Sequence, residues 1–233
     1  GSSHRWPDPA LRRHLPRSNG SAWVDDGAML QNHPIFTESI RLIRESLGET
    51  GLEPLQQQVL ERLIHSSGDL KIGERLCFSP NACELGINAL RDRALVLTDT
   101  EMAAAAVRPM AKRTLGVSVR CVLEWAPAQA PTGSTRSAVG LRAAWKTCSV
   151  VKPAPLILIG SAPTALNELL DLQGEGLPAP SLVIGMPVGF VGVAESKDQL
   201  AKSALAQIRL DGTRGGAGLV AASVNALLMA SVC

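Results

Sequence analysis

The strongest constraint on the fold is an alternation of short β-prone runs with helical stretches, which fills the chain after Leu90. The expected strands cover residues 94–97, 117–123, 156–159, 182–184 and 207–210. The expected helices cover residues 100–107, 135–145, 164–172, 194–205 and 218–230. Such alternation is typical of βα units, whose strands form a parallel sheet covered by helices on both faces. We therefore expect an α/β fold with a three-layer, doubly wound, mainly parallel sheet of about five strands.

A helical N-terminal segment is expected before this alternating region. Apolar residues, Phe36 among them, recur at helical spacing over residues 35–47, and Gly48 ends the run. A second helix is expected from Pro54 to the turn at residues 66–68. The Ser79-Pro80 pair is typical of an N-cap followed by a first-turn proline, and it predicts a third helix that ends near Leu90.

The first 33 residues differ from the rest of the chain. They are rich in Arg, Pro, Ser and Asp and carry no apolar period. We expect residues 1–33 to form a flexible N-terminal arm and residues 34–233 to form a single α/β domain.

The overall composition excludes several classes of protein. Lys and Arg number 23 against 21 Asp and Glu, a balance that argues against nucleic-acid binding. The chain has no Tyr, three Phe and four Trp, too few for an aromatic base-stacking surface. Its apolar runs are far shorter than the ~20 residues that a membrane span needs, so no membrane association is expected. The five cysteines are scattered and form no CxxC pair, as is typical of reduced thiols in a cytoplasmic protein.

The loops that follow the expected strands point to a ligand site. Residues 160–164, 185–190 and 212–216 carry glycines, and residues 98–100 read Thr-Asp-Thr. In open parallel sheets, ligands bind beyond the carboxyl ends of the strands. Glycines let backbone N–H groups approach a ligand, and helix N-termini favour anions. The pattern predicts a ligand with several negative groups; the alternative is a set of ordinary βα turns.

Two arginines lie where such a ligand would bind. Arg136 is at the expected start of a helix, where a cation opposes the helix dipole unless an anion lies between them. Arg214 lies in the glycine-bearing loop at residues 212–216. The alternative for both is a solvated surface arginine. Neither loop has the spacing of a nucleotide-binding fingerprint.

His65 is the histidine best placed for chemistry. It ends an apolar helix, and Arg62 lies three residues earlier on the same helix face. An imidazole exchanges protons near neutral pH, and an arginine can hold a carboxylate beside it. The alternative is a histidine placed at a helix C-terminus by the helix dipole. No second ligand lies at metal-binding spacing, so no metal site is expected.

Several segments resemble one enzyme family. Residues 182–197 read Leu-Val-Ile-Gly-Met-Pro-Val-Gly-Phe-Val-Gly-Val-Ala-Glu-Ser-Lys. Residues 160–166 read Gly-Ser-Ala-Pro-Thr-Ala-Leu, and residues 213–217 read Thr-Arg-Gly-Gly-Ala. Residues 62–69 read Arg-Leu-Ile-His-Ser-Ser-Gly-Asp. In this order, and over residues 35–230, the chain resembles the precorrin-8X methylmutases of cobalamin biosynthesis, also called precorrin isomerases.

The resemblance implies an activity. Members of the family move a methyl group from C11 to C12 of precorrin-8X or its cobalt form, giving hydrogenobyrinate or cobyrinate. The shift is intramolecular and needs no metal or organic cofactor from the protein. The resemblance also implies a homodimer. One acid and an enforced reactive conformation are effects that a protein supplies by itself.

The resemblance also implies roles for individual residues. His65 matches the family's histidine, the implied general acid. Ser39 lies in the family's Arg-Ser-Phe motif, which reads Glu38-Ser39-Ile40 here. The residues implied to bind the substrate are Ser39, Arg62, Arg136 and Arg214.

Two other functions are kept as alternatives. A non-catalytic corrinoid-binding or carrier protein would take the same ligand, although the retained His65 argues against it. A nucleotide- or sugar-phosphate-binding enzyme on a doubly wound sheet would need a phosphate-binding loop with fingerprint spacing, which the sequence does not contain.

Overall fold

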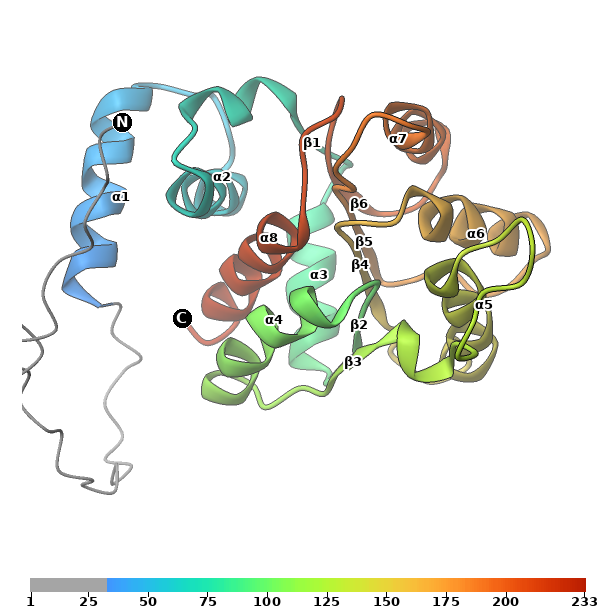
Figure 1. The fold of residues 1–233 in the computed structure, drawn as a ribbon. Coiled ribbons are helices and arrows are strands. Elements are labelled where there is room, and N and C mark those ends of the chain that lie inside the picture. The colour runs from blue at the N-terminus through green and yellow to red at the C-terminus, as the bar shows by residue number, and fades with distance from the viewer. Residues whose placement is uncertain (1–32) are drawn as a thin grey trace, which may run out of the picture. The chain divides into compact units, whose positions relative to one another are not determined.

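The computed structural model describes residues 33–233, which form a six-stranded sheet with helices on both faces (Figure 1). The strands are β1 (Leu76–Phe78), β2 (Val96–Thr98), β3 (Val119–Cys121), β4 (Leu156–Ile159), β5 (Leu182–Gly185) and β6 (Gln207–Leu210). Their order is β1-β6-β5-β4-β2-β3, and only the β1–β6 pair is antiparallel. The predicted α/β class and mainly parallel sheet are confirmed. The arm expected at residues 1–33 lies outside the described residues, apart from His33.

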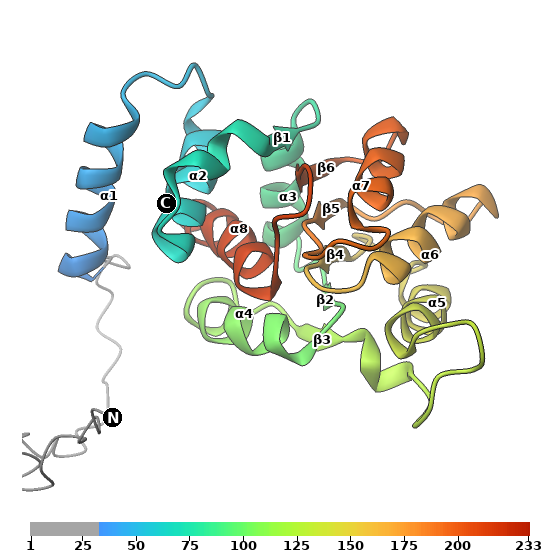
Figure 2. The same cartoon turned by 45° about the horizontal axis from the view of Figure 1, so that its top comes forward.

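Helices form the two outer layers. One face of the sheet is covered by α5 (Arg136–Cys148), α6 (Pro163–Gly174) and α7 (Val193–Lys202). The other is covered by α3 (Ala82–Arg91), α4 (Glu101–Arg113) and α8 (Ala217–Ala230), and α2 (Pro54–Ser67) packs on α8. The helix α1 (Pro34–Leu47) packs on α2 and not on the sheet (Figures 1 and 2). The described residues also include two short 3₁₀ helices, η2 (Leu70–Arg75) and η3 (Val122–Trp125).

Strand β4 explains why the sheet needs both layers. All four of its residues are apolar and buried. Successive side chains on a strand point to opposite faces, so Leu156 and Leu158 pack with α8 while Ile157 and Ile159 pack with α5 and α6. A strand that is apolar on both sides is stable only when both faces are covered.

Helix α8 is the centre of the first layer. Nine of its residues are buried, because α2 and α4 flank it and the sheet lies beneath it. A helix that is apolar on all sides is expected in a buried position of this kind. Within residues 33–233, every helix is too short or too polar to cross a membrane.

Two details of the fold differ from what the sequence predicts. Strand β1 was not predicted, because three half-buried residues carry no periodic pattern and their partner strand lies about 130 residues away. Ser79 is not the N-cap of α3: the helix begins at Ala82, after Asn81 in the left-handed conformation. The Ser79 Oγ instead accepts a hydrogen bond from the Gln207 backbone N–H at 2.8 Å, and thereby fastens the end of β1 to β6.

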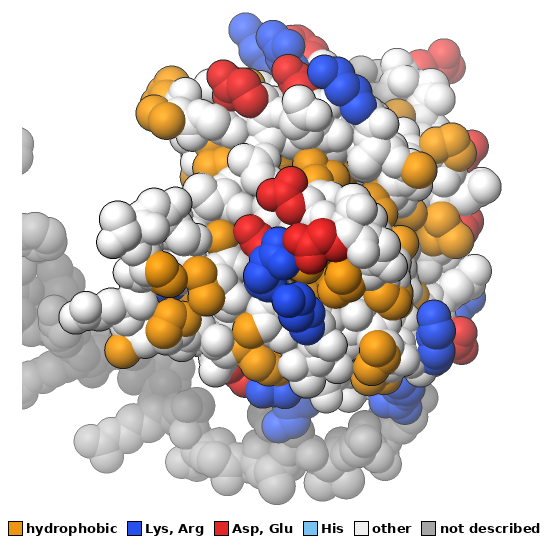
Figure 3. Space-filling model, turned by 90° about the vertical axis from the view of Figure 1, so that its right-hand side faces the viewer, with side chains coloured by type: hydrophobic (Ala, Val, Ile, Leu, Met, Phe, Trp, Pro, Cys, Tyr) orange, Lys and Arg blue, Asp and Glu red, His pale blue; other side chains and the backbone are white. Residues whose placement is uncertain are grey.

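The outer side of the α5–α6–α7 layer carries charges of both signs (Figure 3). Arg142 of α5 pairs there with Glu168 of α6 and with Glu175, which follows that helix. The guanidinium of Arg142 is thus already neutralised by the protein's own carboxylates.

Candidate active site

The order of the strands predicts a binding region at the carboxyl ends of the parallel strands. The chain runs from β2 to β3 on one side of β2, and then continues on the other side with β4, β5 and β6. The connections therefore reverse direction between β2 and β4, the point at which doubly wound sheets open a crevice. The glycine-bearing loops that follow β4, β5 and β6 lie along this edge, as the sequence predicts.

His65 lies in the last turn of α2 and faces α1. Both helices begin with a proline, Pro34 and Pro54, and α2 ends at Gly68 in the left-handed conformation with φ 68°. The Nδ1 atom of His65 is 2.7 Å from the Ser39 Oγ of α1, in a hydrogen bond that joins the two helices. The imidazole is exposed, and its Nε2 has no hydrogen-bond partner among residues 33–233. One nitrogen is therefore held by Ser39, while the other makes no hydrogen bond within the described residues.

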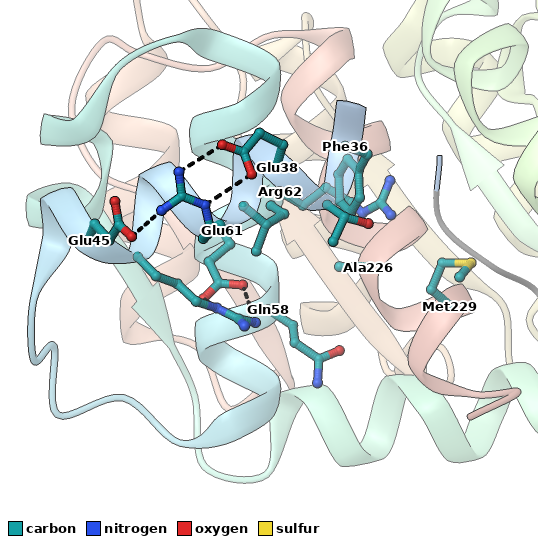
Figure 4. Close-up of a pocket in the computed structure, with 12 residues that line it drawn as sticks. Phe36, Glu38, Glu45, Gln58, Glu61, Arg62, Ala226 and Met229 are labelled. Carbon is teal, nitrogen blue, oxygen red and sulfur yellow. Dashed lines mark hydrogen bonds and ion pairs between the residues drawn. The ribbon is translucent and has the colours of Figure 1, made fainter. Parts of the chain in front are cut away.

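Phe36 lies between His65 and Arg62. Its ring meets the imidazole edge-on, with centroids 4.8 Å apart and an angle of 73° between the planes. The Cζ of Arg62 lies 4.4 Å from the centroid of the same ring (Figure 4). Sequence analysis assigned Phe36 only to an apolar helix stripe. A signal was present, because Phe36 and Ser39 are three residues apart on one helix, as Arg62 and His65 are on the other.

Arg62 lines a cavity of about 600 Å³ between α1, α2 and α8 (Figure 4). Burial lowers the pKa of its guanidinium, and the like charge of Arg113 lowers it further. Arg41 and Arg44 line the same cavity but are paired, Arg41 with two carboxylates of α1 and Arg44 with the buried Glu61. Within the described part of the chain, no carboxylate pairs with Arg62. This cation therefore remains available for an anionic ligand.

His65 and Ser39 line a second cavity, of about 690 Å³, on the other side of α1. Its walls are largely apolar and include Ile35 and Leu70. Helix α1 thus lies between two cavities, one lined by Arg62 and the other by His65. The two side chains lie next to Phe36 from one helix, as their spacing predicts, but they line different cavities.

Arg214 reaches the same region from the loop after β6. Its guanidinium pairs with Asp69, which follows the turn at the end of α2. The other carboxylate oxygen of Asp69 accepts a hydrogen bond from the Lys71 N–H at 3.0 Å and caps η2. The structure therefore joins Arg214 to a carboxylate that follows the His65 helix, although Arg214 lies far from His65 in sequence.

Arg136 lies in a different place. It begins α5, in the opposite helix layer, and its Nε donates a hydrogen bond to the Pro127 carbonyl at 2.9 Å. Among residues 33–233 it contacts none of Ser39, Arg62 and His65. The structure thus gathers Ser39, Arg62 and His65, pairs Arg214 with Asp69 just beyond the same helix, and leaves Arg136 apart.

Asp99 anchors the loop at the reversal point. It follows β2 and is fully buried. Its Oδ2 accepts hydrogen bonds from the N–H groups of Ser161 and Ala162 at 2.7 and 2.8 Å, which ties the loop after β4 to β2. Its Oδ1 is buried without a partner in the described structure. Burial raises the pKa of Asp99, against the opposing effect of the backbone hydrogen bonds.

This raised pKa predicts a pH-dependent stability. A carboxyl whose pKa rises on folding is penalised when charged, so the native state loses stability as the pH rises above the unfolded pKa of about 4. We expect the Tm of Asp99→Asn to gain on that of the wild type as the pH rises above about 4. Asp99→Ala should melt below both proteins, because two N–H groups lose their acceptor. A constant difference between Asp99→Asn and wild type over this range would contradict the assignment.

Comparison with known proteins shows which family the chain belongs to. The family model described as "Precorrin-8X methylmutase" matches residues 34–230. The chain belongs to this family. Its relatives include the precorrin-8X methylmutase of Pseudomonas aeruginosa, 38% identical over 202 residues, covering 83% of this chain and 93% of the relative. They also include the cobalt-precorrin-8 methylmutase of Synechocystis sp., 33% identical over 211 residues, covering 84% of this chain and 95% of the relative.

A solved structure of a precorrin-8X methylmutase supports the same assignment. The Thermus thermophilus enzyme superposes with a TM-score of 0.76 at 32% identity, and the match covers 85% of this chain and 95% of that one. The methylmutase described here is therefore an isomerase of cobalamin biosynthesis. The resemblance seen in its sequence is confirmed.

Proposed function

We propose that this methylmutase moves the methyl group at C11 to C12 of precorrin-8X or its cobalt form, with His65 as the general acid. The products are hydrogenobyrinate and cobyrinate. The observation that carries the proposal is the Ser39–His65 hydrogen bond, which fixes the exposed imidazole at the wall of a cavity and leaves Nε2 without a hydrogen bond among residues 33–233.

Ser39 suits this role because its hydroxyl oxygen can accept a hydrogen bond from an imidazole N–H. The Ser39 Oγ accepts from Nδ1–H when the imidazole is charged, and it still accepts from Nδ1–H after the ring has given its Nε2 proton to the substrate. The proton that is transferred is therefore the one on Nε2, the nitrogen that does not bond to Ser39. The acid protonates the macrocycle, the methyl group migrates within the substrate, and the proton returns to His65, so no atom is gained or lost.

The arginines suit the substrate's acidic arms. A contracted tetrapyrrole carries several acetate and propionate groups, and a guanidinium binds a carboxylate with two parallel hydrogen bonds. Arg62 supplies an unpaired cation on the Phe36 ring, and Arg214 supplies one that it shares with Asp69. We assign Arg136, at the N-terminus of α5, to an arm at the sheet edge.

We also propose that the methylmutase works as a homodimer. Ile35, Leu42 and Leu70 are 72%, 50% and 45% exposed, and all three line the cavity beside His65. A cluster of exposed apolar residues of this kind favours contact with another protein surface. We propose that this surface belongs to a second copy of the chain. A solution mass twice that of one chain is the expected result.

The cysteines bear on where the enzyme works. Cys83, Cys121 and Cys148 are buried and unpaired, and burial raises the pKa of Cys83 to about 12. Inert, unpaired thiols of this kind are typical of a reducing compartment. We propose the cytoplasm.

Ser39→Ala tests how much the hydrogen bond to His65 contributes. Without the hydroxyl the imidazole is free to turn, so we expect kcat to fall by about tenfold while KM changes little. Ser46→Ala is the matched control, because within the described part of the chain the Ser46 hydroxyl on the same helix bonds only to the Leu42 carbonyl. Steady-state rates of the two variants make the comparison, and equal rates for Ser39→Ala and Ser46→Ala would remove Ser39 from the mechanism.

The proposed reaction is tested by visible spectroscopy, because the isomerisation changes the chromophore of the ring. Purified protein is mixed with metal-free precorrin-8X, and absorption spectra are recorded over time. Conversion to the spectrum of hydrogenobyrinate supports the proposal. A bound but unconverted pigment, with both the metal-free and the cobalt form, would instead favour a corrinoid carrier. Conversion of the cobalt form alone would assign the enzyme to the cobalt-containing route.

A further inference from the structure

Lys197 of α7 is a charged residue that has no role in the proposed reaction. Its side chain is fully buried. The Nζ atom donates hydrogen bonds to two backbone carbonyls, those of Gly212 at 2.7 Å and Arg214 at 2.6 Å. Both carbonyls belong to the loop between β6 and α8 that carries Arg214. Within the described residues no carboxylate forms an ion pair with Lys197.

Burying this ammonium group is costly. Desolvation lowers the pKa of Lys197 to about 8, and the nearby charge of Asp211 offsets only part of that effect. Replacement of a buried charge by an apolar residue of similar size is often neutral or stabilising for a protein. A lysine at this position therefore needs an explanation beyond packing, and the two short bonds to the Arg214 loop provide one.

Two backbone hydrogen bonds to the segment after β5 also hold this loop. The Thr213 carbonyl accepts a hydrogen bond from the Gly189 N–H at 3.0 Å, and the Gly216 N–H donates to the Met186 carbonyl at 2.9 Å. A Cβ at Gly215 would lie only 2.0 Å from that Met186 oxygen, so the two backbones touch directly. The backbone around Arg214 is thus bonded on both flanks, while its side chain is about half exposed and reaches Asp69.

We infer that Lys197 is a positioning residue, which holds the backbone of Arg214 so that its guanidinium meets a carboxylate arm of the substrate beside His65. This inference rests on the proposed function, because it takes Arg214 as a ligand of the corrinoid. Lys197 itself is buried and does not touch the substrate. Its effect on binding must therefore pass through Arg214.

A double-mutant cycle separates this role from a general effect on folding. The variants are Lys197→Met, Arg214→Ala and the double variant, and the measured quantity is the Kd for hydrogenobyrinate from its visible spectrum. We expect each single variant to weaken binding by about tenfold or more, the loss of one charge-assisted contact. The double variant should bind as Arg214→Ala does, because Lys197 has nothing left to position. Lys202→Met, at an exposed lysine of the same helix, is the control and should bind as the wild type does.

Each other outcome is decisive. Independent losses that multiply in the double variant, or normal binding by Lys197→Met, would overturn the inference. Normal binding by Arg214→Ala would also overturn it, while turnover by the wild type would leave the proposed function standing. A wild type that neither binds nor converts the corrinoid would reject both. If Lys197→Met does not fold, Lys197→Gln, which keeps an N–H donor, takes its place in the cycle under the same criteria.

Discussion

Replacing His65 with alanine is expected to abolish turnover while the protein stays folded. General-acid catalysis contributes about 10²- to 10⁴-fold to a rate, so kcat should fall by at least about a hundredfold. Among residues 33–233 the exposed imidazole forms one hydrogen bond, to Ser39, and one aromatic contact, to Phe36, so little packing is lost. The measurement is the initial rate of precorrin-8X conversion by the two proteins, with Tm and Kd as companions.

His33→Ala is the matched control for this experiment. His33 accepts a hydrogen bond from the Ile35 N–H at the start of α1, and its loss weakens a helix cap without touching the imidazole of His65. We expect a slightly lower Tm and near-normal turnover. An equal loss of rate in both variants would mean that His65 supports the helix pair and does not supply the proton.

Arg62→Ala is expected to weaken corrinoid binding by about 10- to 100-fold with little change in stability. The side chain loses a cation–π contact with Phe36, worth about 0.5–1 kcal/mol at such sites. Its removal also relieves repulsion from Arg113, which offsets part of that loss. A carboxylate arm loses a charge-assisted partner of about 1.5–3 kcal/mol. Titration of hydrogenobyrinate gives the Kd, and thermal unfolding gives the stability.

Arg44→Ala is the contrasting variant for Arg62, because it lies in the same cavity but is already paired. Its Nε and Nη2 donate to Glu61 at 2.7 and 3.0 Å, and the Glu61 side chain is only 3% exposed. Removal of Arg44 leaves a buried carboxylate whose remaining partner among the described residues is the Gln57 amide, so we expect a loss of about 1–3 kcal/mol in stability and an unchanged Kd. A lower Tm with normal binding in Arg62→Ala would assign Arg62 the same structural role.

The parallel part of the fold could be predicted because its strands and helices carry local patterns. The buried run at β4 is bounded by a proline and a glycine, and the helices on either side show apolar periods. Strand β1 could not be predicted in this way, since it pairs with β6, a strand about 130 residues away in the chain. The start of α3 was misplaced because Ser79 bonds to the distant Gln207 and not to its own helix.

The residues of the candidate site also divide into those that local spacing could predict and those that depend on distant contacts. Arg62 and His65 could be paired from their spacing on one helix. The contact of His65 with Ser39 depends on how α1 docks on α2, and no local pattern encodes that docking. Lys197 lies inside a segment that resembles the methylmutases, yet its two partners are backbone carbonyls of another loop. Every residue has a backbone carbonyl, so the amino-acid sequence does not indicate which carbonyls accept a hydrogen bond from a side chain. The position of Lys197 could therefore be found only in the structure.

The central claim, that His65 drives a methyl shift from C11 to C12, is tested most directly by isotope labelling. Precorrin-8X with a ¹³C-enriched methyl group at C11 is incubated with a catalytic amount of the wild type and, separately, with His65→Ala. NMR should then find the label at C12 of the product with wild type and still at C11 with the variant. Label that stays at C11 with wild type, or that moves equally fast with His65→Ala, would contradict the claim.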